Sequence, residues 1–238
     1  MRSPSEGAFY GDGGLTKKEK AERAAGVIAA LKEIYPETAC ALLYGGDEWR
    51  LFVMGRLSAQ CTDKRVNEVA RELFSVLPDA EAMRRAPLSA IEELVRPCGL
   101  YRTKAKNLRD SAEKLCNEYG GVLPHDMESL LSFPGVGRKI ANLLRGDLWG
   151  LPAVVTDTHC IRICGRLGFY PESEKNPTKI ETILASLLPP AEQSDFCHRI
   201  VDFGRDTCTA RSPKCNICPL NTAGLCDYGR RKNGKDKA

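Results

Sequence analysis

The sequence lacks any long apolar segment. None of its 238 residues lies in a run that approaches the roughly 18 apolar residues expected of a membrane-spanning helix. The first residues, Met1 to Gly7, contain no apolar stretch of the kind that a secretion signal carries. We therefore expect an intracellular, cytoplasmic protein with no membrane partner. Its eleven cysteines should serve metal ligation or core packing, because reducing compartments keep thiols free of disulfides.

The sequence also lacks the alternating pattern of β-strands. Apolar residues recur instead at helical spacing, for example from Val66 to Leu77. Capping boxes, in which Ser or Thr precedes Glu by three residues, predict helix starts at Thr16 and at Ser89. The last helix is expected from about Asp195 to Phe203, where Gly204 would end it. The sequence therefore predicts an all-α fold.

Excess positive charge is missing from the body of the chain. The tail from Gly229 to Ala238 holds five basic residues and one acidic residue, a surplus that equals the whole net charge of +4. Nucleic acid would therefore have to be bound by a local basic surface and by backbone amides. We expect the tail to be solvated and disordered, with nonspecific attraction to nucleic acid as the alternative.

The stretch from Leu130 to Leu144 contains a bend between two helical patterns, and Arg138 and Lys139 open the second pattern. Gly135 and Gly137 remove side chains where the backbone must turn and where a phosphate could approach the amides. The second helix would present free N–H groups and its positive dipole end to that anion. The stretch fits neither common nucleotide-binding loop pattern. It predicts a tight hairpin of two helices, with an ordinary helix connection as the alternative.

Four cysteines fall within 19 residues near the end of the chain: Cys208, Cys215, Cys218 and Cys226. This density on a loop that contains Pro and Gly indicates four thiolates that converge on one centre. A [4Fe-4S] cluster is favoured. Zinc is the alternative, although zinc sites more often pair two C-x2-C units, and free thiols are a third possibility. A metal centre would also hold Arg211 and Lys214 in place as phosphate contacts, whereas the alternative is a merely solvated loop.

Together these features resemble the endonuclease III family, the iron–sulfur branch of the helix-hairpin-helix DNA glycosylases. The likeness spans roughly residues 20 to 228 and rests on segments in a fixed order: SAQ-x-TD at 58–63, GLY at 99–101, PGVGRK at 134–139, TDTH at 156–159 and FGR-x-x-C at 203–208, followed by the remaining cysteines. One departure concerns the last cysteine interval, which holds seven residues here and usually five in the family.

The resemblance implies a fold and a set of site residues. Residues 41–151 would form a six-helix barrel with the helix-hairpin-helix motif, and residues 1–40 and 152–238 would form one helical cluster domain. A monomer would bind double-stranded DNA with damaged bases or abasic sites in the cleft between them. In the family, the lysine matching Lys139 is the nucleophile and the aspartate matching Asp157 assists it. Residues matching Gln60 and Leu100 enter the space left by an everted nucleotide.

The expected chemistry explains why these residue types are needed. A nucleophile that attacks the sugar C1′ and remains bound as an imine must be a neutral amine. Lysine is almost fully protonated at neutral pH, but a helix N-terminus, neighbouring Arg138 and burial in a cleft would disfavour the ammonium form of Lys139. Asp157 could stabilise charge on the sugar and relay protons, and it could equally cap the next helix.

The leading hypothesis is a base-excision-repair DNA glycosylase with abasic-site lyase activity, by β-elimination, that removes oxidised pyrimidines such as thymine glycol. A monofunctional adenine or mismatch glycosylase of the same superfamily is one alternative, although such relatives generally lack the lysine. A noncatalytic iron–sulfur protein that binds DNA on the same scaffold is another. Release of a base from lesion-containing duplex would distinguish this last protein from both enzymes.

Overall fold

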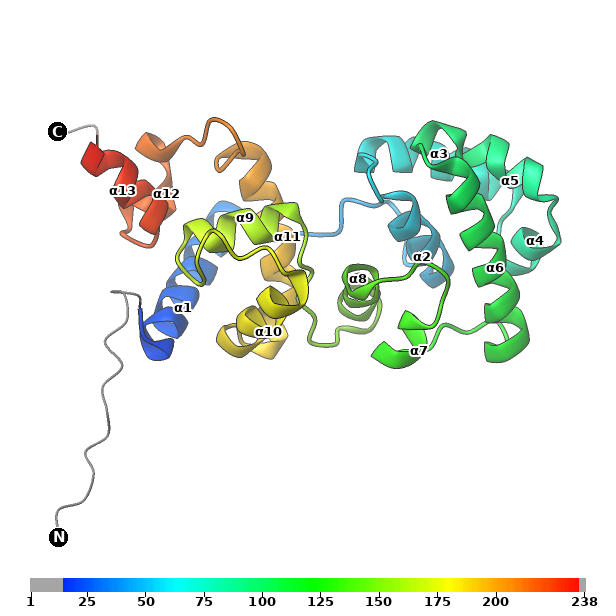
Figure 1. Ribbon diagram of the computed structural model, residues 1–238, viewed down its shortest axis with the longest axis horizontal. Coiled ribbons are helices and arrows are strands. Elements are labelled where there is room, and N and C mark those ends of the chain that lie inside the picture. Colours follow the sequence, from blue (N-terminus) through cyan, green and yellow to red (C-terminus); the bar gives the residue numbers. More distant parts are fainter. Residues whose placement is uncertain (1–14, 236–238) are drawn as a thin grey trace, which may run out of the picture.

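The computed structural model describes residues 15–235, and every regular element in that range is helical (Figure 1). The predicted all-α fold is therefore confirmed for this part of the chain. The helices form two lobes that lie beside each other, and the segment between α1 and α2 joins them (Figure 1). No described helix is long and apolar enough to cross a membrane.

The middle of the chain forms one lobe. Its elements are α2 (Glu48–Leu57), α3 (Asp63–Val76), α4 (Ala80–Arg85), α5 (Leu88–Val95), the short 3-10 helix η1 (Arg96–Cys98), α6 (Tyr101–Tyr119), α7 (Met127–Leu131) and α8 (Arg138–Trp149). Their apolar faces share one buried core, in which Phe52 and Phe133 pack edge to face with ring centroids 5.3 Å apart. This is the lobe that contains the hairpin.

The two ends of the chain form the other lobe. Its elements are α1 (Lys17–Ile34), α9 (Thr158–Arg166), α10 (Pro177–Leu187), η2 (Pro190–Glu192), α11 (Gln193–Asp206), η3 (Cys215–Ile217), α12 (Pro219–Thr222) and α13 (Asp227–Lys235). Val27 and Leu31 of α1 share a second buried core with Phe196 and Phe203 of α11. Because each lobe has its own core, we propose the domain division at residues 41 and 151, with 1–40 and 152–238 as one discontinuous domain. Residues 1–14 and 236–238 of that domain lie outside the described range.

Local capping residues define the ends of several helices. The capping box predicted at Thr16 is present, formed by Thr16 and Glu19 at the start of α1. Asn176 caps α10, and Pro177 occupies its first position, where the missing N–H costs no helical hydrogen bond. Gly120 ends α6 in a left-handed conformation. These starts and stops depend on neighbouring residues only, which explains why the sequence predicts them.

Two predicted boundaries are wrong. No capping box forms at Ser89, because α5 already begins at Leu88 after Pro87, which has the φ of a helix start. Helix α11 does not stop at Gly204 but continues to Asp206. A Cβ at Gly204 would lie 2.3 Å from Nδ1 of His159 on α9. Glycine is therefore needed there for the close packing of α9 against α11, and it does not end the helix.

The chain also continues in helices beyond the predicted last one, in α12 and α13. Helix α13 includes most of the basic tail, so the expected disorder is wrong for residues 229–235, while residues 236–238 lie outside the described range. Arg230 pairs with Asp227 and Arg231 pairs with Glu172. These acidic partners stabilise the tail in a helix, and they were not evident from the tail's own sequence.

Candidate catalytic and DNA-binding site

The predicted hairpin is present between α7 and α8. Gly135 turns the chain with a φ of +69°, a left-handed conformation that glycine adopts without steric cost. Gly137 is the N-cap of α8 and offers no side-chain cap, so the amides of the first turn remain available to an anion. A Cβ at Gly137 would have no atom within 4 Å, which leaves room for a phosphate.

Buried Arg56 of α2 supports the hairpin, a role that the sequence did not indicate. Its guanidinium donates a hydrogen bond to the carbonyl of Gly135, and burial lowers the pKa of this guanidinium. A Cβ at Gly135 would collide with it, since the nearest atom lies at 2.1 Å. Glycine at 135 is therefore required by a close approach as well as by its backbone conformation.

Lys139 lies in the first turn of α8, and its side chain is exposed. The expected burial in a cleft is wrong for this structure. Arg138 is also engaged: its Nε and Nη2 donate to the carboxylate of Glu181 on α10 at 2.8 and 2.6 Å. This bidentate pair neutralises the neighbouring charge and ties α8 to α10. The DNA contact of Arg138 stays a prediction.

Asp157 lies at the end of the segment that connects α8 to α9. The carbonyl of Val154 in this segment accepts a hydrogen bond from the Asn142 side chain of α8 at 3.1 Å, so the segment packs back against the helix that it leaves. The N–H of Asp157 bonds to the carbonyl of Val155 at 3.0 Å, and its carboxylate caps α9, accepting from the N–H of Cys160 at 2.7 Å. The pairing of Asp157 with Lys139 in one site stays a prediction.

Gln60 and Leu100 share an uncommon backbone conformation. They are the two non-glycine residues of the described chain with positive φ, at 54° and 49°. Such conformations are strained and cluster at functional sites, where the surrounding structure maintains them. Both side chains are exposed, Leu100 to 58% although it is apolar. We call their segments the Gln60 loop (residues 58–62) and the Leu100 loop (residues 96–100).

Lys104 of α6 joins these two loops. Its side chain is buried, with 4% of the residue exposed, and burial lowers its pKa. The Nζ atom donates to three backbone carbonyls, those of Leu57, Ala59 and Cys98, at 2.9, 2.8 and 2.8 Å. All three donor positions of one ammonium are therefore used to hold the Gln60 loop beside the Leu100 loop. No local sequence pattern marks this lysine, because its partners Leu57 and Ala59 are distant in the chain.

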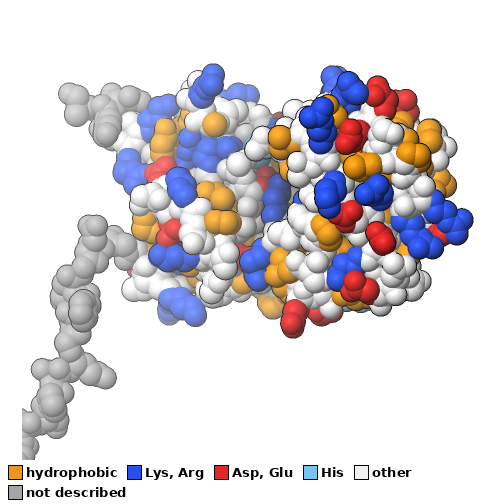
Figure 2. All heavy atoms as spheres, turned by 45° about the vertical axis from the view of Figure 1, so that its right-hand side comes forward, with side chains coloured by type: hydrophobic (Ala, Val, Ile, Leu, Met, Phe, Trp, Pro, Cys, Tyr) orange, Lys and Arg blue, Asp and Glu red, His pale blue; other side chains and the backbone are white. Residues whose placement is uncertain are grey.

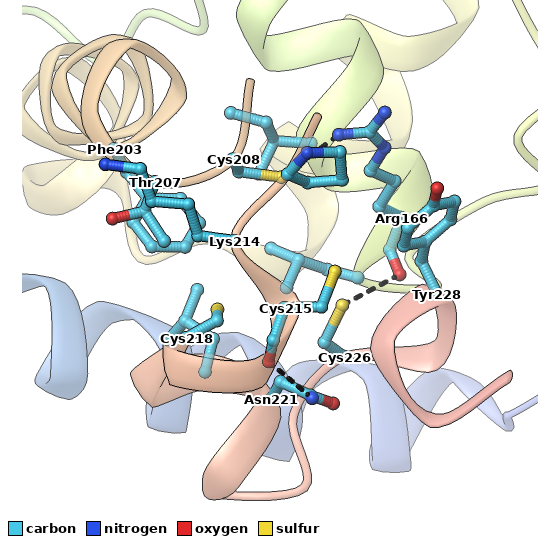
Figure 3. Close-up of a pocket in the computed structure, with 14 residues that line it drawn as sticks. Arg166, Phe203, Thr207, Cys208, Lys214, Cys215, Cys218, Asn221, Cys226 and Tyr228 are labelled. Atoms are coloured by element: carbon cyan, nitrogen blue, oxygen red, sulfur yellow. Dashed lines mark hydrogen bonds between the residues drawn. The ribbon is translucent and has the colours of Figure 1, made fainter. Parts of the chain in front are cut away.

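The four C-terminal cysteines surround one cavity in the second lobe (Figure 3). Cys208 follows α11, Cys215 opens η3, Cys218 precedes α12 and Cys226 precedes α13. All four are buried. Within residues 15–235, no group of three or more His, Cys, Asp or Glu side chains is close enough to share a single metal ion. Four cysteine thiolates are the ligand set of a [4Fe-4S] cluster, so the residues that line this cavity fit one.

Arg166 of α9 organises the segment around the first of these cysteines, a second role that the sequence did not indicate. Its guanidinium donates to Sγ of Cys208 at 3.3 Å and to the carbonyls of Thr209 and Ala210 at 2.8 and 2.9 Å. It also lies over the ring of Tyr228, 4.7 Å from the centroid. Hydrogen bonds to cysteine sulfur tune iron–sulfur clusters, so Arg166 fits such a site.

Arg211 and Lys214 are exposed on the loop that Arg166 anchors. The N–H of Lys214 bonds to the carbonyl of Thr207 at 3.0 Å, which closes the loop at its other end. Lys and Arg side chains occur on both lobes of one face, several of them beside the boundary between the lobes (Figure 2). Hydrogen bonds therefore fix the backbone of this loop at both ends. The phosphate contacts of Arg211 and Lys214 stay predictions.

Comparison with known proteins identifies the family. Residues 53–190 match the HhH-GPD superfamily base excision DNA repair protein model, and residues 208–222 match the iron-sulfur binding domain of endonuclease III. Endonuclease III of Synechocystis sp. is 41% identical over 208 residues, which are 87% of this chain and 93% of that protein. The chain belongs to the endonuclease III family. Endonuclease III of Bacillus subtilis is 36% identical, over 85% of this chain and 91% of its own.

Solved structures agree with this assignment. A non-covalent complex of endonuclease III with DNA has a TM-score of 0.83 at 35% identity and covers 92% of this chain and 99% of its own. A trapped covalent intermediate of endonuclease III with DNA gives the same values. As a member of the endonuclease III family, the chain is a DNA glycosylase and abasic-site lyase of base excision repair, and it carries a [4Fe-4S] cluster. Ligation of the cluster by Cys208, Cys215, Cys218 and Cys226 stays a prediction, and the matched cluster domain ends at residue 222, before Cys226.

Replacing Cys215 with serine is expected to remove or weaken the cluster and to loosen the loop with Arg211 and Lys214. DNA affinity should then fall about tenfold through lost phosphate contacts, while single-turnover chemistry on DNA already bound should change less. Iron analysis and binding titrations at fixed salt would measure both effects. Cys116→Ser, at a half-buried cysteine outside the loop, is the control and should keep its iron. A Cys215→Ser protein with full iron content would exclude Cys215 as a ligand.

Proposed function

We propose that Lys139 and Asp157 are the catalytic residues with which this DNA glycosylase and abasic-site lyase removes oxidised pyrimidines, such as thymine glycol, from duplex DNA. The observation that supports this assignment is the exposure of Lys139 on the first turn of α8, directly after the free amides of the hairpin. A phosphate bound by those amides would bring the sugar of the DNA to this amine. Asp157 caps the start of α9, and its place beside Lys139 is part of the proposal.

In the proposed reaction the neutral amine of Lys139 attacks C1′ of the everted nucleotide. The bond from C1′ to the base breaks, and the base leaves with a proton. The carboxylate of Asp157 stabilises the positive charge that develops on the sugar. The C1′–O4′ bond then breaks as the nitrogen loses a proton, O4′ takes up a proton, and an imine joins Lys139 to the opened sugar.

Strand cleavage follows from the imine. Removal of a C2′ proton allows the C3′–O bond to break, so the 3′ phosphate leaves by β-elimination, and water finally hydrolyses the imine to free Lys139. Asp157 is positioned to relay these protons. Because its carboxylate also caps α9, the helix start holds it in one orientation.

The DNA would be held from both lobes. The amides after Gly137 bind one phosphate, and Arg211 and Lys214 contact the backbone from the cluster lobe. Gln60 offers hydrogen bonds to the orphan base, and Leu100 wedges into the stack beside the extruded nucleotide. The strained conformations of Gln60 and Leu100 and their exposure support this role. The protein would act as a monomer, and its substrate would be the chromosomal DNA inside the cell.

Borohydride treatment during reaction with a thymine-glycol duplex tests the proposal, because it reduces the imine to a stable amine. We expect a covalent protein–DNA adduct, base release and strand cleavage. Base release without an adduct would indicate a monofunctional glycosylase. Absence of base release from a panel of lesions, with duplex binding intact, would indicate a noncatalytic DNA-binding protein.

A further inference from the structure

Cys61 and Cys98 lie next to the two residues that are proposed to enter the DNA. Cys61 directly follows Gln60, and Cys98 precedes Leu100 by two positions. Both cysteines are free. Although they are separated by more than thirty residues, they belong to loops that Lys104 holds together through the carbonyls of Ala59 and Cys98.

The two thiols are neighbours. Nζ of Lys104 bonds both to the carbonyl of Ala59, two residues before Cys61, and to the carbonyl of Cys98 itself, at 2.8 Å each. Burial and, after it, the neighbouring Cys61 raise the pKa of the Cys98 thiol. Cys98 is only 3% exposed, whereas Cys61 is partly exposed. A small oxidant from solvent would therefore meet Cys61 first and find a second thiol directly behind it.

The other cysteines outside the cluster loop lack this combination. Cys160, Cys164 and Cys197 contact one another but are fully enclosed in the second core, so an oxidant does not reach them. Cys40 and Cys116 are partly exposed, and their polar neighbours are the acids Asp147 and Glu81 respectively. Among the described cysteines outside the cluster loop, Cys61 is thus the partly exposed thiol that has a second thiol, Cys98, as its neighbour.

We propose that mild oxidation by a peroxide joins Cys61 and Cys98 in a disulfide that cross-links the Gln60 loop to the Leu100 loop and slows base excision. Formation of the disulfide is inferred from the positions of the two cysteines alone. Its effect on base excision rests on the proposed function of Gln60 and Leu100.

One molecule of hydrogen peroxide is the oxidant for each disulfide that forms. The Cys61 thiol loses its proton, and the thiolate attacks one oxygen of hydrogen peroxide. The O–O bond breaks, Cys61 becomes a sulfenic acid, and the hydroxide that leaves takes up the lost proton to form water. The sulfur of Cys98 then attacks the Cys61 sulfur, its proton and the hydroxyl group leave as a second water, and the S–S bond forms. Two thiols are oxidised and one peroxide is reduced to two waters.

A disulfide would change the loops that it joins. The S–S bond is about 2.05 Å and has a narrow dihedral preference, so the two sulfurs must leave their positions as free thiols to form it. The shift is transmitted to Gln60 and Leu100 within one or two residues. A misplacement of about 1 Å can lower a catalytic rate a hundredfold. Because Gln60 and Leu100 support the extruded nucleotide and do not react with it, we expect a smaller loss, of about tenfold, in the rate of base release.

The test treats the cluster-bound protein with stoichiometric hydrogen peroxide, maps disulfides by alkylation and peptide analysis, and measures base release from thymine-glycol duplex. We expect one Cys61–Cys98 disulfide, a loss of about tenfold in rate, and recovery with dithiothreitol. Cys61→Ala should keep its rate after the same treatment. Cys116→Ala, the matched control at another partly exposed cysteine, should respond like the unmodified protein. The visible absorbance of the cluster is followed throughout to detect cluster damage.

Three results would overturn the proposal: both thiols still open to alkylation after treatment, equal inactivation of Cys61→Ala, or a mapped disulfide with unchanged base release. If the reduced protein released no base at all, the proposed function would fail. The peptide map would still decide whether the disulfide forms.

Discussion

Lys139→Gln is expected to abolish the borohydride-trapped adduct and to lower base release and strand cleavage about a thousandfold or more. Glutamine keeps most of the length and the hydrogen-bonding reach of lysine, but its amide nitrogen cannot form an imine. Lys139 is exposed in the first turn of α8. Its replacement should therefore change the free energy of unfolding by less than about 0.5 kcal/mol. Binding to abasic duplex should survive, because the amides of the hairpin remain.

The matched control for this change is Lys18→Gln, since Lys18 is also an exposed lysine at the second position of a helix, α1. It should keep full adduct formation. Thermal unfolding would show whether either variant is misfolded. If Lys139→Gln protein still gave an adduct, another amine would be the nucleophile, and if it failed to fold, Lys139 would have a structural role.

Asp157→Asn is expected to lower base release by about a hundredfold to ten-thousandfold, the range of general acid–base catalysis. The carboxylate accepts the N–H of Cys160 at 2.7 Å as the cap of α9, and asparagine caps helices nearly as well as aspartate. The free energy of unfolding should therefore change by less than about 1 kcal/mol. Single-turnover base release and denaturant unfolding, measured on the same preparation, would separate the two roles.

Asp79→Asn is the control for the capping part of that prediction. Asp79 caps α4 by accepting the N–H of Ala82 at 2.7 Å, the same distance as at Asp157, and it lies outside the proposed site. The two variants should lose similar stability, but only Asp157→Asn should lose activity. Unimpaired turnover of Asp157→Asn would leave Asp157 with capping as its only role.

The success and failure of the sequence predictions follow the range of the interactions involved. The hairpin was predictable because Gly135 and Gly137 act on their own backbone. The end of α11 was not, because Gly204 is needed for its contact with His159 of α9. The order in the tail was missed for the same reason, since Glu172, which pairs with Arg231, lies 59 positions away.

The sequence by itself determined the helical class, the helix starts at Thr16 and after the hairpin, and the family resemblance, through which it predicts the catalytic pair, because caps, helical periodicity and motif spacing act over a few residues. Only the tertiary structure decided which charges are paired and which loops are joined. Arg138 meets Glu181 across 43 positions, Lys104 meets Leu57 across 47, and Arg166 meets Cys208 across 42. Such contacts form when separate apolar faces pack into a common core, and that packing sets burial and partners that no local pattern contains.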